Sequence, residues 1–196
     1  MYRAAFGECR FDVLQKQMEK WESGEMEMQV KREHLDIMKL QEKMDRIVFD
    51  YIDTSNNYRK AMRELNQLYT QVISFYKDFI DERADEIPPS NTYWFLFIDC
   101  SAKLCFFLAS AIYYASNELQ DTPKTVEKLL ETAALILPNI DQEDNEAFLT
   151  AIFELYKEIV VDETKTVRLR DGVLAQKGNV TQCLQQFKQF VQVENN

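Results

Sequence analysis

A seven-residue hydrophobic repeat organises the N-terminal half of the chain. Counting in sevens from Ile37 to Phe79 gives an apolar or aromatic side chain at every step, and neither Gly nor Pro occurs between Glu25 and Ile87. A repeat sustained over this length predicts one long helix with an apolar seam that requires a partner. The candidate partner-binding seam consists of Ile37, Met44, Tyr51, Tyr58, Leu65, Leu68, Val72 and Phe79.

The weakest point of this predicted helix is the run of short polar residues from 53 to 57. Asp, Thr, Ser and Asn side chains compete for backbone hydrogen bonds and have indifferent helix propensity. A bend or a hairpin turn near Asn56 is therefore an alternative to an unbroken helix. We favour one helix, because the seven-residue count crosses this run without a change of phase.

The rest of the chain is predicted to form shorter helices. A short amphipathic helix precedes the repeat at 10–22, and Pro88 with Pro89 ends the long helix because proline cannot continue it. We expect an all-α protein, with a long heptad-bearing helix in an N-terminal unit (1–87) and a multi-helix bundle packed on it (88–196). Apolar residues at spacings of three and four predict the bundle helices at 93–118, 122–137, 141–159 and 180–191, whereas the pattern at 164–177 is unclear.

Residues 93–118 form the most apolar segment, and their length matches a bilayer span. Asp99 and Lys103 lie within about 40° of each other on a helix, and charges at the centre of a membrane are costly. We therefore expect this segment to be a helix of a soluble protein, buried on most sides, with the polar edge facing water.

Composition and charge narrow the cellular setting. Four Gly and four Pro among 196 residues are too few for many tight turns, which favours helices. A net charge of −10 disfavours nucleic-acid binding, which gains affinity from clustered Lys and Arg. The four cysteines form no CxxC pair and the first residues resemble no secretory signal, so we expect free thiols in the cytoplasm or nucleus.

Residues that carry catalytic or metal chemistry are few. His34 is the only histidine and lies among charged residues, which excludes zinc sites with several imidazoles. The acidic run from Asp141 lacks the Gly and the bidentate Glu that a calcium-binding loop requires at its sixth and twelfth positions. No glycine-rich phosphate-binding loop occurs. We expect no cofactor, no metal site and no enzymatic activity.

Two groups of basic residues lie off the seam of the predicted long helix. A membrane-binding helical dimer needs such a stripe to contact anionic lipid head groups. Acidic residues are interleaved with these cations and cancel much of their field, which favours an ordinary solvated surface. The candidate anionic-ligand patch consists of Lys39, Lys43, Arg46, Arg59, Lys60 and Arg63.

The length of the seam leads to the expected function. An unbroken helix over the repeat would measure roughly 70 Å, more than any one later helix covers, and an exposed apolar strip promotes aggregation. We therefore expect a helical adaptor or scaffold that binds a protein partner, or a second copy of itself, through the seam. The alternative is a membrane-surface dimer that binds anionic lipid. A third hypothesis is a small-ligand carrier with an apolar pocket around Trp94, Phe97, Phe106 and Tyr113.

Overall fold

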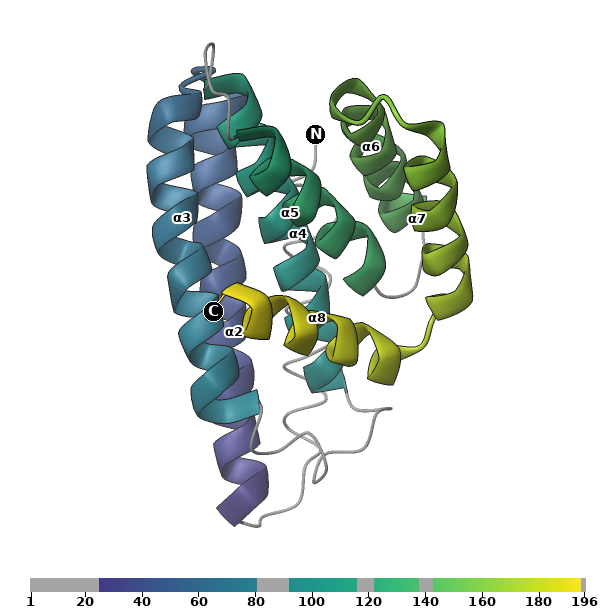
Figure 1. The fold of residues 1–196 in the computed structure, drawn as a ribbon. Helices are drawn as coiled ribbons and strands as arrows, with labels where there is room; N and C mark the ends of the chain where they lie inside the picture. Colours follow the sequence, from purple (N-terminus) through teal and green to yellow (C-terminus); the bar gives the residue numbers. More distant parts are fainter. Residues whose placement is uncertain (1–24, 81–91, 116–121, 138–142, 195–196) are drawn as a thin grey trace.

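The computed structural model describes residues 25–80, 92–115, 122–137 and 143–194 (Figure 1). The elements in this described part of the chain are all helical and include no strand, which confirms the all-α prediction. In chain order they are α2 (Glu25–Ile47), the π-helical segment η1 (Val48–Asp53), α3 (Tyr58–Phe75), the π-helical segment η2 (Tyr76–Ile80), α4 (Thr92–Ala115), α5 (Thr122–Ile136), α6 (Glu143–Ile159), α7 (Glu163–Gln176) and α8 (Val180–Glu194).

The seven-residue repeat folds into a hairpin of two antiparallel helices. α2 and its extension η1 end at Asp53, and α3 begins at Tyr58 and runs back alongside α2 (Figure 1). The prediction of one unbroken helix is therefore wrong, and the alternative of a turn near Asn56 is correct. The predicted helix at 10–22 and the predicted boundary between 87 and 88 lie outside the described residues.

Short polar side chains make this turn. The hydroxyl groups of Thr54 and Ser55 donate to the carbonyl oxygens of η1, at 2.7 and 2.9 Å for their shortest contacts. Asn56 has a φ of 49°, a left-handed conformation that asparagine tolerates better than most residues. The Asn57 carboxamide oxygen then accepts a hydrogen bond of 3.2 Å from a backbone N–H in the first turn of α3 and caps that helix.

α4 is the central helix of the molecule. The hairpin packs against it, α5 packs along it, and α8 lies across both α4 and α5 (Figure 1). α6 and α7 pack on α5, on the side of the molecule away from the hairpin. Apolar side chains of the hairpin and of the later helices belong to the same core cluster, so the two predicted units share one core.

The polar edge of α4 is buried, which corrects the expectation that it faces water. Asp99 is fully buried and Lys103 is 5% exposed, and Lys103 Nζ lies 2.9 Å from Asp99 Oδ2. Because the two charges neutralise each other one helical turn apart, the edge can enter the core. Trp94–Ala115 is the one helical stretch of the described chain that is long and apolar enough to cross a membrane, and most of its residues are buried inside the protein. Such burial is typical of a core helix.

Aromatic side chains connect the hairpin, α4 and α8. The Phe97 ring lies 6.1 Å from the Tyr76 ring and 5.3 Å from the Phe187 ring, centroid to centroid. Phe106, one of the four residues of the proposed carrier pocket, packs on Phe148 at 4.8 Å, while Trp94 and Phe97 are buried in the core. Phe97 and Phe106 thus pack against other aromatic rings, as core residues do.

Candidate protein-binding surface

The seam of the seven-residue repeat lies inside the protein. In the hairpin, each arm turns its apolar side toward the other arm and toward α4, so the chain covers its own seam. This corrects the expectation that apolar surface remains along the seam for a second chain. The buried seam residues are Ile37, Met44, Leu65, Leu68 and Val72, and the partly buried ones are Tyr51, Tyr58 and Phe79.

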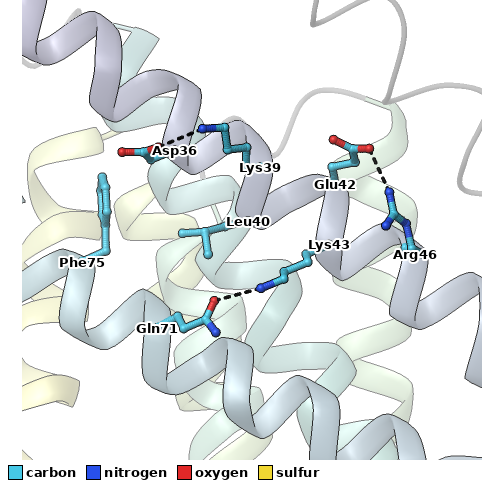
Figure 2. Close-up of a pocket in the computed structure, with 8 residues that line it drawn as sticks. All are labelled: Asp36, Lys39, Leu40, Glu42, Lys43, Arg46, Gln71 and Phe75. Atoms are coloured by element: carbon cyan, nitrogen blue, oxygen red, sulfur yellow. Dashed lines mark hydrogen bonds and ion pairs between the residues drawn. The ribbon is translucent and has the colours of Figure 1, made fainter.

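The first basic group lines a groove between α2 and α3 (Figure 2). The groove has a volume of about 510 Å³, and carboxylates lie beside its cations. Lys39 Nζ lies 3.4 Å from Asp36 Oδ1, and Arg46 Nη2 lies 3.1 Å from Glu42 Oε1. The groove is lined by Asp36, Lys39, Leu40, Glu42, Lys43, Arg46, Gln71 and Phe75.

The other cations of the candidate anionic-ligand patch contact neighbouring side chains or lie on the other arm of the hairpin. Lys43 donates to the side-chain oxygen of Gln71 across the groove at 3.5 Å (Figure 2). The second group, Arg59, Lys60 and Arg63, begins α3 on the opposite arm, and the Lys60 amine lies 4.6 Å from the centroid of the Tyr51 ring. Because acidic partners offset the first group, the hairpin offers a mixed polar surface and not a continuous basic stripe.

An exposed apolar surface is found instead on α7, in the segment whose pattern was unclear. Val161 is 91% exposed in the link before α7, and Val167 and Leu174 are 54% and 67% exposed on the helix itself. Val167 and Leu174 are seven residues apart, so they lie within about 20° of each other around the helix axis. We call Val161, Val167 and Leu174 the α7 outer face.

The opposite side of α7 is fixed to the core. Thr166, Leu169 and Val173 are buried there. Gly172, which weakens a helix on propensity alone, permits close packing on α5, because a Cβ at this position would meet the Leu135 side chain at 3.1 Å. Apolar residues therefore occur on both sides of α7, which explains why the sequence pattern was unclear and why the outer face was missed.

The N-terminal end of α7 is also held in place. Asp162 caps the helix, because its Oδ1 accepts a hydrogen bond of 2.9 Å from the backbone N–H of Thr164. Lys165 Nζ lies 2.7 Å from Glu127 Oε1 on α5, and this contact raises the pKa of Lys165. The α7 outer face is thus displayed by a helix with a defined position on α5.

Charged residues of both signs accompany the α7 outer face. Residues 163–177 contain four cations and two carboxylates, although the whole chain has a net charge of −10. Arg168 and Arg170 are exposed on α7, and the guanidinium carbon of Arg170 lies 5.3 Å from the centroid of the Phe153 ring. Asp162 adds a third carboxylate just before α7, and Lys165 is paired with Glu127. The face therefore combines apolar side chains with a mixed polar surface.

The histidine and the cysteines that the structure describes are buried away from α7. His34 is 1% exposed, and burial lowers its pKa from 6.5 to about 4. Burial also raises the pKa of the Cys100 thiol to about 12 and that of the Cys183 thiol to about 11. No group of three His, Cys, Asp or Glu side chains suited to a metal ion occurs among the residues that the structure describes.

Comparisons of the chain with protein-family models, curated proteins and solved structures yield no match. The function is therefore inferred from the fold and from the α7 outer face. Together they describe a helical bundle with exposed apolar side chains on and beside α7, and α7 lies on the side of the molecule away from the hairpin (Figure 1).

Proposed function

We propose that the protein is a non-enzymatic helical adaptor or scaffold that binds a protein partner through the α7 outer face. The exposure of Val161, Val167 and Leu174 carries this proposal. Single exposed apolar residues are common on protein surfaces. Val167 and Leu174 share one line of a helix, and Val161 is exposed in the link before that helix, so α7 offers the apolar centre that a small interface needs.

The rigidity of α7 supports the same proposal. A partner that binds a preformed surface loses less conformational entropy than one that must first order it. The cap at Asp162, the ion pair between Lys165 and Glu127 and the close contact of Gly172 with Leu135 hold α7 before any partner arrives. Since this interface is small, we expect a transient or composite contact within a larger assembly.

Affinity purification of the full-length protein from its native extract tests the proposal. We expect Leu174→Asp and Val167→Asp to lose the associated proteins, because each places a charge in the apolar centre of the interface. Leu35→Asp is the matched control, because Leu35 is an exposed leucine on α2 in the hairpin. The same associated proteins in all three variants would contradict a partner site on α7.

A membrane-surface function of the hairpin remains the alternative hypothesis. Ion pairs at Lys39 and Arg46 argue against it, because they reduce the positive field of the groove. Cosedimentation with anionic vesicles at low and high salt is the test, since charge-driven binding weakens with salt. We expect no binding at either salt concentration. Salt-sensitive binding that Lys43→Ala reduces and Leu174→Asp preserves would favour the membrane.

A further inference from the structure

We propose that the partner of the α7 outer face is a second copy of this chain, with the two α7 helices side by side and parallel. This inference rests on the proposed function and names the partner. Val167 and Leu174 of each copy pack against the same residues of the other copy. Arg170 of each copy pairs with Asp171 of the other.

One cation and one carboxylate flank the apolar line from Val167 to Leu174 symmetrically. At about 100° per residue, Arg170 lies about 50° to one side of this line, and Asp171 lies about 50° to the other side. The two residues are consecutive, so they differ in height by only about 1.5 Å along the helix axis. Both side chains are exposed, and neither forms an ion pair with another residue that the structure describes. The face therefore presents one charge of each sign at the same level.

This arrangement complements itself when two α7 helices run parallel. A two-fold axis along the helices places each flank of one copy opposite the other flank of the second copy. Arg170 of one copy then faces Asp171 of the other, and the reciprocal pair forms across the axis. Opposite charges beside an apolar seam set the orientation of paired helices in the same way in coiled coils. The two copies contribute the same surface, as the commonest class of protein dimer requires.

Like charges disfavour the antiparallel orientation, in which each flank faces the same flank of the second copy. Arg170 would face Arg170 and Asp171 would face Asp171 at the centre of the contact. These two repulsions would offset the attraction between Glu163 and Lys177 at the two ends. In the parallel pair, Glu163 faces Thr164, which is uncharged, and the two central contacts are both attractive. The parallel orientation is therefore the favoured one.

The small size of the surface predicts weak association. Three apolar side chains bury less than the roughly 1,200–2,000 Å² of a stable interface, and exposed ion pairs add little. We therefore expect a dimer that dissociates at low micromolar concentration and forms at roughly several hundred micromolar. A larger assembly that holds two copies close together would favour it further.

Sedimentation velocity of the purified full-length protein over this concentration range tests the inference. We expect Leu174→Asp to remain monomeric. Arg170→Asp and Asp171→Arg should each weaken the dimer by about tenfold, because each replaces two attractions with two repulsions. An equal mixture of these two variants should regain the affinity of the wild type, since every facing pair then has opposite signs. Arg63→Asp, in the hairpin, makes the same change of charge as a matched control and should leave the dimer unchanged.

Cysteine cross-linking measures the orientation of the two helices. In a Cys9→Ser background, the remaining native cysteines are buried. Val167→Cys should then form a disulfide-linked dimer on mild oxidation, because parallel helices bring position 167 of one copy beside position 167 of the other. A mixture of Val167→Cys and Leu174→Cys should give few mixed dimers. Mostly mixed dimers would show antiparallel helices and overturn the inference.

Thermal unfolding of each variant checks that the fold is intact. Asp171→Arg leaves the Arg170 guanidinium against the Phe153 ring, so it tests the pairing even if Arg170→Asp alters the fold. A protein that stays monomeric at every concentration would overturn the inference. A dimer whose affinity changes with neither substitution would do the same.

The two proposals fail in different ways. If the purified protein is monomeric but Leu174→Asp removes other proteins from the native complex, the adaptor function stands and the second copy is the wrong partner. If Leu174→Asp changes neither the native complex nor the association of the purified protein, the α7 outer face is not the partner site and both proposals fail.

Discussion

At the scale of single residues, the pair of Asp99 and Lys103 is the least expected feature of the core. Two charges removed from water lose hydration, which is offset here by their contact at 2.9 Å. Lys103 Nζ also lies 5.9 Å from the centroid of the Phe148 ring. The stability of the pair depends on both members being present, because either alone would be a buried charge.

Lys103→Met should therefore destabilise the protein strongly. We expect the free energy of unfolding to fall by about 3–5 kcal/mol, because the Asp99 carboxylate would lose its partner inside the core. Asp99→Leu combined with Lys103→Met should recover most of this loss. Urea unfolding of the wild type, the two single variants and the double variant measures the coupling. Additive losses would show that the two charges do not depend on each other.

His34 should make the protein sensitive to acid. Its pKa is lowered from 6.5 to about 4, so the unfolded chain binds a proton below about pH 6.5 whereas the folded chain resists it. Stability is fully present above this window and is lost as the pH falls through it, by roughly 3 kcal/mol in total. His34→Gln should lose less stability between about pH 7 and about pH 4.5. Equal pH dependence of the two proteins would exclude His34 as the cause.

At the scale of elements, the turn between the two arms of the hairpin depends on one left-handed residue. Asn56→Gly should preserve or slightly raise stability, because glycine adopts the φ of 49° without strain. Asn56→Val should lower the free energy of unfolding by about 1–3 kcal/mol, because a β-branched residue is strained in this conformation. Thermal unfolding distinguishes the two variants, and equal midpoints would mean that the turn tolerates any residue here.

The sequence predicted the helices but not the path between the first two. The seven-residue repeat reports which side of a helix is apolar, and that side is the same in a rod and in a hairpin whose arms pack on one core. The polar run at 53–57 marked the correct place for a turn. Tertiary packing decides the outcome: α4 and the opposite arm together bury Ile37, Met44, Leu65, Leu68 and Val72 and partly cover the other seam residues.

Two other predictions failed for reasons of packing. Helical spacing placed Asp99 and Lys103 on one edge of α4, but it could not show that their mutual neutralisation lets the edge enter the core. On α7, spacing could not separate Leu169, which is buried, from Val167 and Leu174, which are exposed. The identification of an outer face required the position of α5 beneath α7.

At the scale of the whole molecule, a substitution in the buried seam should affect the folding of the protein. Leu65 is fully buried in the shared core. Leu65→Asp should abolish the cooperative unfolding transition, because it introduces an unpaired charge where the hairpin meets the rest of the protein. Lys60→Ala, on the exposed side of the same helix, should change the free energy of unfolding by less than about 1 kcal/mol. Circular dichroism during urea unfolding measures both, and a folded Leu65→Asp protein would contradict the shared core.

The turn at 54–57 also determines whether the arms of the hairpin make their contacts within one molecule or between two molecules. If these four residues were all replaced by alanine, a strong helix former, the two arms would favour one straight helix. Each arm could then regain its core only against the arm of another molecule, and two copies would exchange arms to form an intertwined dimer. Gel filtration of that variant should show twice the mass of the parent protein. A few polar side chains would then determine whether the two arms pack within one molecule or between two.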